Sequence, residues 1–84
     1  MQIELTKDAV KYFNKMNGSI KLRLTQAFEK LLFEPPQGDI FPLQGKNNIY
    51  RLRVGNLRIL FSVNKNDNII LISKISPRGD AYKN

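Results

Sequence analysis

The stretch that most constrains this chain runs from residue 48 to residue 63 and has the pattern of a β-hairpin. Two runs of alternating residues flank Gly55-Asn56, a pair that supplies the positive φ that a two-residue turn requires. With these two residues as the loop, one side of the hairpin is formed by three apolar pairs: Val54 with Leu57, Leu52 with Ile59, and Tyr50 with Phe61.

The other side of the same hairpin is cationic. Arg53 lies directly opposite Arg58, and Arg51 lies one diagonal step away. Like charges in this position are destabilising, because the Cβ atoms of directly opposed residues are only about 4.5–5.5 Å apart. A fold that keeps such a pair usually holds an anion beside it, so we interpret this side of the hairpin as an anion-binding face.

The net charge of +7 is concentrated in the half of the chain that contains the hairpin. Residues 1–45 carry six basic and five acidic side chains, whereas residues 46–84 carry eight basic and two acidic ones. This distribution suits phosphate or an acidic partner. Cysteine and histidine are absent, which excludes disulfides, thiol nucleophiles and the usual general base at neutral pH. The few carboxylates are scattered, so we expect no metal and no cofactor.

The length of 84 residues predicts a single domain spanning residues 1–84. No apolar run approaches the roughly 20 residues that cross a bilayer, so no membrane association is expected. The first ten residues lack the layout of a signal peptide, and the expected location is therefore the cytoplasm.

The remaining segments complete a β-α-α-β-β-β order. Residues 1–5 alternate weakly as a short strand, and a helix capped by Thr6 or Asp8 is predicted to run to about Met16. A second helix, with Ser19 as its N-cap, is predicted to end before Pro35-Pro36.

A loop over residues 34–48 should be held on the core by Ile40, Phe41 and Leu43. After the hairpin, a five-residue turn at 64–68 would lead into a strand at 69–75 that is covered on both faces, and would pair Lys74 with Arg58. The prediction is a two-layer α+β domain with a mainly antiparallel sheet, two N-terminal helices on one face, and the arginines on the open face.

Four segments in this order carry a resemblance to a known family: Leu43-Gln44-Gly45, Tyr50-Arg51-Leu52-Arg53-Val54, Leu57-Arg58-Ile59-Leu60-Phe61 and Pro77-Arg78-Gly79-Asp80-Ala81-Tyr82-Lys83. Together they resemble the RelE/ParE superfamily of type II toxin–antitoxin toxins, and the RelE branch in particular. The resemblance covers almost the whole chain and implies the RelE-like microbial RNase-type fold.

What the resemblance implies about activity is cleavage of mRNA in the ribosomal A site. The ribose 2′-OH attacks its own 3′ phosphate and leaves a 2′,3′-cyclic phosphate. The family pattern implies catalytic roles for five residues: basic residues at Arg51 and Arg53, a phosphate-stabilising arginine at Arg58, an arginine at Arg78 that protonates or stabilises the leaving oxygen, and a stacking aromatic at Tyr82. Additional RNA contacts are expected from Lys46, Lys74 and Lys83. The partners implied are the ribosome, its mRNA and a cognate antitoxin with an acidic segment.

The sequence departs from the family at two places. Some relatives have lysines at the positions of Arg51 and Arg53, and others have a histidine at the position of Pro77. Arginine keeps its proton in proteins, so neither arginine can act as a conventional base. Lys46, Asp80, Glu34 and a ribosomal group remain open as proton acceptors. Two other functions also remain open: a ParE-like inhibitor of DNA gyrase, and an inactive basic module that acts only with its antitoxin.

Overall fold

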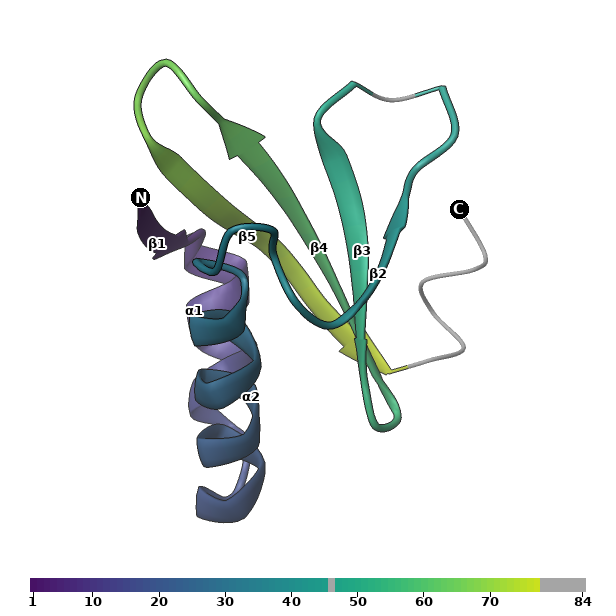
Figure 1. Cartoon of the computed structure of the whole chain (residues 1–84). Coiled ribbons are helices and arrows are strands. Elements are labelled where there is room, and N and C mark those ends of the chain that lie inside the picture. Colours follow the sequence, from purple (N-terminus) through teal and green to yellow (C-terminus); the bar gives the residue numbers. More distant parts are fainter. Residues whose placement is uncertain (46, 78–84) are drawn as a thin grey trace.

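The computed structural model describes residues 1–45 and 47–77 of the 84-residue chain. One strand, two helices and four further strands follow one another along the chain, as Figure 1 shows. Their bounds are β1 Gln2–Leu5, α1 Lys7–Asn14, α2 Gly18–Lys30, β2 Asp39–Pro42, β3 Ile49–Val54, β4 Leu57–Asn64 and β5 Ile69–Pro77. The predicted α+β class, the first strand, both helices and the hairpin are confirmed, and β2 is an additional strand.

The strands form one five-stranded sheet in the order β1-β5-β4-β3-β2. Neighbouring strands are antiparallel except β1 and β5, which are parallel. The predicted mainly antiparallel sheet is therefore confirmed. β5 has a strand on either side, but the expectation that both of its faces are covered is wrong, because Lys74 is exposed.

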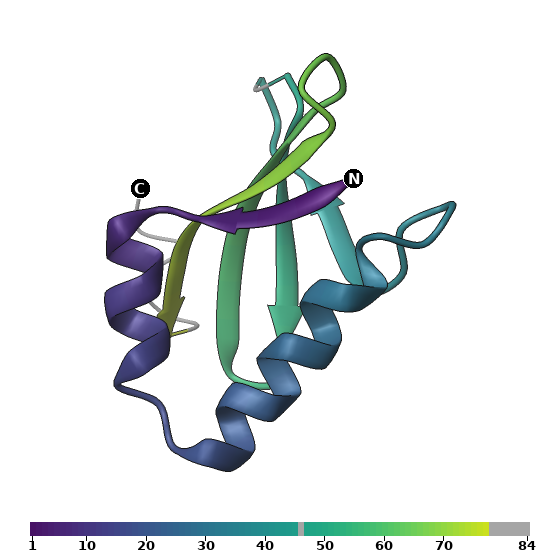
Figure 2. The same cartoon turned by 90° about the vertical axis from the view of Figure 1, so that its left-hand side faces the viewer.

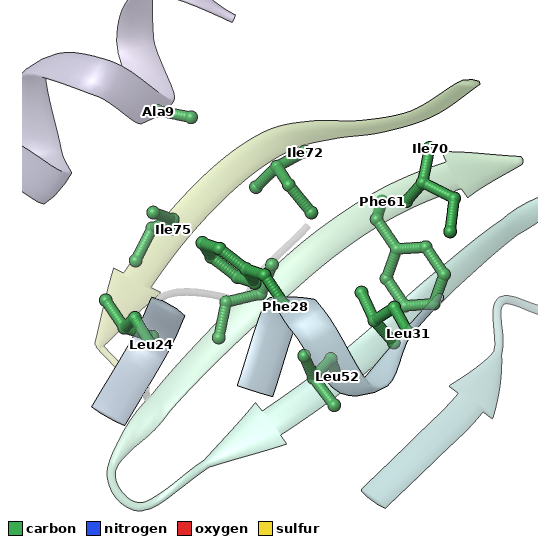
Figure 3. Close-up of a cluster of buried hydrophobic side chains, with 10 residues drawn as sticks. Ala9, Leu24, Phe28, Leu31, Leu52, Phe61, Ile70, Ile72 and Ile75 are labelled. Atoms are coloured by element: carbon green, nitrogen blue, oxygen red, sulfur yellow. The ribbon is translucent and has the colours of Figure 1, made fainter. Parts of the chain in front are cut away.

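Both helices pack against the same face of the sheet, as Figure 2 shows from the helix side. The inward residues of α2 recur every three or four positions, so they form a stripe along one side of the helix. This helix stripe meets alternate residues of the strands, and Figure 3 shows the resulting core, formed by Ala9, Leu24, Phe28, Leu31, Leu52, Ile59, Phe61, Ile70, Ile72 and Ile75. The rings of Tyr50 and Phe61 stack with centroids 5.4 Å apart, as the hairpin pattern predicted.

The helix starts are fixed by local hydrogen bonds. Thr6 caps α1, since its side chain accepts from the backbone N–H of Ala9 at 3.3 Å. The predicted cap of α2 was wrong: Asn17, and not Ser19, accepts from the backbone N–H of Ile20 at 3.0 Å. The helix therefore begins at Gly18, because the asparagine carbonyl already satisfies one of the free donors of the first turn.

Strand β2 lies inside the segment that the sequence predicted to be a loop. It pairs with β3 from Asp39↔Arg53 to Pro42↔Tyr50 and forms one edge of the sheet. Proline is compatible with an edge strand, since the N–H that it lacks can face solvent. Ile40 packs on the core as expected, but Phe41 is 42% exposed, so its predicted docking on the core was wrong.

Neither helix among the described residues is long and apolar enough to cross a membrane.

Candidate nucleic-acid interface

The candidate site lies on the face of the sheet opposite the helices, and strand pairing defines it. Directly paired residues point to the same face, and residues two apart on a strand do so as well. The pairings therefore place two parallel rows of side chains across four strands: Asp39–Arg53–Arg58–Ser76 and Phe41–Arg51–Leu60–Lys74. We call these two rows the arginine face.

The hairpin turn sets the register between the arginines. Gly55 has a φ of +58°, and Val54 pairs with Leu57, so the loop is the two residues predicted. A positive φ at the first loop residue is typical of a type II′ turn. Arg53 consequently pairs with Arg58, which confirms the opposed like charges expected from the sequence.

The anion that accompanies the opposed arginines belongs to the protein itself. The Nε–H of Arg53 donates to Oδ2 of Asp39 at 2.7 Å, from the directly paired position on β2. Along three strands, this row therefore consists of one acidic residue followed by two basic residues. Because both side chains are about two-fifths exposed, at 41% and 39%, solvent screens the pair and its contribution to stability is modest. Its geometric effect is to draw one end of the Arg53 guanidinium towards β2.

Arg58 has a different environment from Arg53, although the two are paired. It lies on the central strand β4 and is 1% exposed, which makes it one of the largest fully buried side chains. Ser76, its partner on β5, is also buried at 5% exposure. The prediction that Arg58 lies on an open face was therefore correct about the face and wrong about the exposure. Its directly paired neighbours are Arg53 on β3 and Ser76 on β5.

Arg51 lies in the second row and contacts an aromatic ring. Its guanidinium carbon is 5.3 Å from the ring centroid of Phe41, on the directly paired position of β2. Guanidinium groups are attracted to aromatic faces at this distance. The short edge strand thus contributes one side chain to each hairpin arginine on β3: Asp39 to Arg53, and Phe41 to Arg51.

Lys74 belongs to the arginine face, but its predicted pairing with Arg58 was wrong. The β4–β5 turn is one residue shorter than expected, since Asn64 pairs with Ile69, and a bulge shifts the register between Leu60 and Phe61. Lys74 therefore pairs with Leu60 and Ser76 pairs with Arg58. A register shift of one residue would place Lys74 on the helix side. The shorter turn and the bulge together shift the register by two residues, so Lys74 stays on the arginine face.

Four predicted site residues lie outside the described residues: Lys46, Arg78, Tyr82 and Lys83. Asp80, one of the possible bases, also lies there. Glu34, another possible base, lines a hollow on the helix side together with Tyr50 and Phe61. It is thus placed away from the arginine face and is not suited to act there.

Asp39 is a site residue that the sequence analysis missed. Its signal was present as the alternation Asp39-Ile40-Phe41 after Gly38, with Pro42 permitted at an edge. Asp39 is also the one carboxylate in the two rows, and it already accepts from Arg53. These rows accordingly present guanidinium and ammonium donors rather than metal ligands.

The chemistry that this arrangement can perform is stabilisation of oxyanions. Neighbouring strands lie about 4.8 Å apart, so three guanidinium groups from β3 and β4 are within reach of one phosphodiester and its neighbour. Guanidinium groups bind phosphate through two parallel N–H donors, and donors fixed in a sheet need little rearrangement as charge builds up.

Comparison with protein families gives a match over nearly the whole chain. Residues 3–82 match the family described as ParE toxin of type II toxin–antitoxin system, parDE. A curated protein of Methanocaldococcus jannaschii, named as a candidate RelE1 toxin, is 34% identical over 85 residues, covering 98% of this chain and 94% of its own.

Solved structures of similar fold include complexes from two archaea. The RelE–RelB complex of Pyrococcus horikoshii has a chain with a TM-score of 0.79 and 30% identity, covering 93% of this chain and 94% of its own. The RelB–RelE complex of Methanococcus jannaschii gives a TM-score of 0.76 at 28% identity, with 94% of both chains covered. The isolated Escherichia coli RelE toxin matches with a TM-score of 0.77 at 14% identity, covering 89% of this chain and 81% of its own, which is a likeness of fold.

Proposed function

Since this chain belongs to the RelE/ParE family of type II toxin–antitoxin toxins, we propose that it is the RNA-cleaving kind, a ribosome-dependent endoribonuclease. The observation that carries the proposal is the arginine face, where Arg51, Arg53 and Arg58 lie on the same side of the neighbouring strands β3 and β4.

The proposed reaction is an in-line displacement at phosphorus. The 2′-oxygen of the nucleotide before the cut forms a bond to the adjacent phosphorus, and the bond from phosphorus to the 5′-oxygen of the next nucleotide breaks. The 2′-hydroxyl proton leaves to a base, the 5′-oxygen gains a proton, and the products are a 2′,3′-cyclic phosphate and a 5′-hydroxyl. Negative charge builds up on the non-bridging oxygens, where fixed cations have their largest effect.

The arginines divide these tasks according to their environments. Arg58 is buried at 1% exposure, and a preorganised donor in such a site is suited to the charge that develops on the reacting phosphate. Arg51 and Arg53 are more exposed and are suited to holding the flanking backbone. Arg78 would assist the leaving oxygen and Tyr82 would stack on a base, for about 1–3 kcal/mol. Lys74 extends the cationic row on β5, and Lys46 and Lys83 are further candidates for backbone contact.

The proton acceptor is not among the residues of the two rows. Arginine keeps its proton, and the Asp39 carboxylate is bonded to Arg53 Nε. Lys46, Asp80 and a ribosomal group are the remaining candidates. A site without its own base would explain dependence on the ribosome, which would supply the missing alignment and proton transfer. We therefore expect free RNA to be cut poorly.

The second partner we propose is an antitoxin with an acidic segment that covers the arginine face. The similar chains from Pyrococcus horikoshii and Methanococcus jannaschii were both solved as RelE–RelB complexes. An acidic segment on this face would compete with RNA for the same guanidinium groups, so neutralisation and catalysis would exclude each other.

One finding favours a second candidate, inhibition of DNA gyrase. The matching family is described by the name ParE, and the sequence resemblance already left a ParE-like gyrase inhibitor open. The two functions differ in what accumulates in the cell: cut mRNA in one case and trapped gyrase–DNA complexes in the other.

The deciding experiment is induction of the chain in a bacterial host, with mRNA ends mapped by primer extension and gyrase cleavage complexes assayed in parallel. Cuts phased to codons support the endoribonuclease, and trapped gyrase supports the second candidate. If neither product is found, the remaining explanation is a basic module that acts only with its antitoxin.

The site assignment is tested by the variants Arg58→Ala and Arg78→Ala, with Lys11→Ala as a matched control on the exposed side of α1. Both arginine variants should lose growth inhibition and lower the cleavage rate by about 100-fold or more, while the control keeps both. Unchanged toxicity in the two arginine variants would contradict the assignment.

A further inference from the structure

A second cationic site lies beside the arginine face, in a cleft between α2 and the end of the β3–β4 hairpin. Figure 2 shows α2 crossing in front of this hairpin turn. The cleft has a volume of about 270 Å³ and runs along β3 past the start of the edge strand β2. It is lined by Arg23, Gln26, Ala27, Lys30, Gln37, Gly38, Asp39, Leu52, Arg53, Val54 and Gly55.

The cations of the cleft come from two elements. Arg23 and Lys30 are seven residues apart on α2, which is about two helical turns and places them on the same side. Arg53 lines the cleft from β3, and Asp39 is the one carboxylate in the lining. Within the described residues the ion pair that forms is Arg53 with Asp39, so no carboxylate there neutralises Arg23 or Lys30.

The guanidinium of Arg23 lies against Gly55 of the hairpin turn. A Cβ built on Gly55 would lie 3.1 Å from Arg23 Nη1 and 3.3 Å from both Cζ and Nη2. These nearly equal distances place the guanidinium plane over the glycine. The N–H donors of a guanidinium lie in its plane, so this contact uses none of them. Gly55, which the hairpin turn needs for its positive φ, thus also leaves room for the guanidinium of Arg23 to pack against the turn.

The lining suits a compact oxyanion. It offers two guanidinium groups, one ammonium group and the side-chain amides of Gln26 and Gln37, and its excess of cations remains after Asp39 is counted. Guanidinium groups bind phosphate through paired donors, and lysine binds it as a point charge. Gly38 and Gly55, which have no side chains, also line the cleft.

Arg53 connects this cleft to the arginine face, because it belongs to both. A nucleic-acid backbone that lies across the arginine face could therefore continue around the β2 edge of the sheet and place a later phosphate between Arg23 and Lys30. We propose that the cleft is a second RNA-backbone site, separate from the reacting phosphate, which contributes to affinity and not to the chemical step. This inference rests on the proposed function for the identity of the RNA.

The test compares two double variants with the same change of charge. Arg23→Gln with Lys30→Gln removes the cations of the cleft, and Lys7→Gln with Lys11→Gln removes two exposed cations from α1. Glutamine is nearly as good a helix former as lysine or arginine, and all four positions are exposed, so both variants should fold. Thermal unfolding followed by circular dichroism checks this.

Binding is measured to ribosomes programmed with an mRNA whose A-site codon carries 2′-O-methyl groups, which prevent cleavage, at several salt concentrations. The cleft variant should bind about 10-fold more weakly. Its affinity should also fall less steeply as salt is added, by a slope that corresponds to about one to two lost phosphate contacts. Its rate of cleavage of an unmodified mRNA at saturating protein should stay within about twofold of the wild type, because an affinity site acts on binding alone. The α1 variant should match the wild type in both measurements.

A charge-preserving variant, Arg23→Lys with Lys30→Arg, should bind more tightly than the glutamine variant because it keeps the cationic charge, and more weakly than the wild type because lysine lacks the paired donors of Arg23. Repeating the binding with ribosomes that lack mRNA identifies the source of the phosphate. A loss on both kinds of ribosome assigns it to ribosomal RNA, and a loss confined to programmed ribosomes assigns it to mRNA.

Wild-type affinity for ribosomes in the Arg23/Lys30 glutamine variant would overturn the inference. It would also be overturned if that variant lost affinity only for a short poly-glutamate peptide, since the cleft would then be a site for acidic protein. Should the wild type fail to cut mRNA, the proposed function fails separately, and the same variants titrated with a short oligo(U) RNA decide the cleft alone.

Discussion

The two faces of this sheet differ in the sequence feature that determines which residues lie on them. The helix side is apolar along every strand, and its residues are buried because they recur with the periods of a helix and of a strand. The arginine face is defined by which residues pair across strands, and its properties change from one strand to the next: Arg58 is 1% exposed on β4, whereas the Arg53 side chain is 41% exposed on β3. The helix side thus holds the buried core, whereas the arginine face carries the charged side chains.

The largest expected effect is on the helix side, at Leu24. This residue is fully buried at 0% exposure, so Leu24→Ala should lower the free energy of unfolding by about 2–5 kcal/mol through lost burial and a cavity. Leu22 on the same helix is 59% exposed, and Leu22→Ala should change it by less than about 0.5 kcal/mol. Urea unfolding measures both free energies, and equal effects would contradict the placement of the core on the side of α2 that carries Leu24.

A smaller loss is expected where the edge strand begins. Gly38 has a φ of +139°, and a Cβ there would lie 2.9 Å from Leu52 Cδ1. Gly38→Ala should therefore cost about 1–3 kcal/mol and displace β2. Gly45→Ala, with a φ of +75° and no atom within 4 Å of the added Cβ, is the control that carries backbone strain without the clash. If the arginine face depends on β2, Gly38→Ala should also slow cleavage in its folded fraction, and the control should not.

The contact between Phe41 and Arg51 should contribute about 0.5–1 kcal/mol, as exposed cation–π pairs do. A double-mutant cycle with Phe41→Leu and Arg51→Gln, followed by urea unfolding, measures this coupling. A coupling near zero would mean that Phe41 only fills space beside the guanidinium.

The smallest expected effect is that of the ion pair between Asp39 and Arg53. Because both side chains are more than a third exposed, their coupling in a cycle of Asp39→Asn and Arg53→Gln should be about 0.2–1 kcal/mol and should fall as salt is added. A coupling that is independent of salt would show that the pair acts by geometry rather than by charge. A larger effect on cleavage than on unfolding would support the role of Asp39 in orienting Arg53.

The sequence was sufficient for the parts of the fold that local signals determine. The turn at Gly55-Asn56 sets the register of β3 and β4, so Arg53 could be placed opposite Arg58 without any tertiary information. The apolar stripe of α2 likewise predicted which of its residues enter the core. In both cases a single period or a single turn decides the outcome.

The parts that could not be predicted depend on irregularities of the backbone. The bulge between Leu60 and Phe61 has no distinct sequence signal, and together with the shorter turn it moves Lys74 from Arg58 to Leu60. Strand β2 was hidden by its four-residue length and by Pro42. Asp39 was missed for the same reason, since its role appears only when β2 is placed beside β3.

The parallel pairing of β1 with β5 has a consequence for the order in which the protein can assemble. Gln2 pairs with Ile69, and the side chain of Thr6, which caps the first helix, donates to the carbonyl oxygen of Ser73 at 3.0 Å. The first strand is therefore made first but paired last, only after β5 has been synthesised. Contacts between such distant segments are entropically costly to close and slow folding. A chain assembled in this way acquires its finished sheet only once β5 has been synthesised, so the ribosome that makes it has translated past Pro77 before the sheet can close.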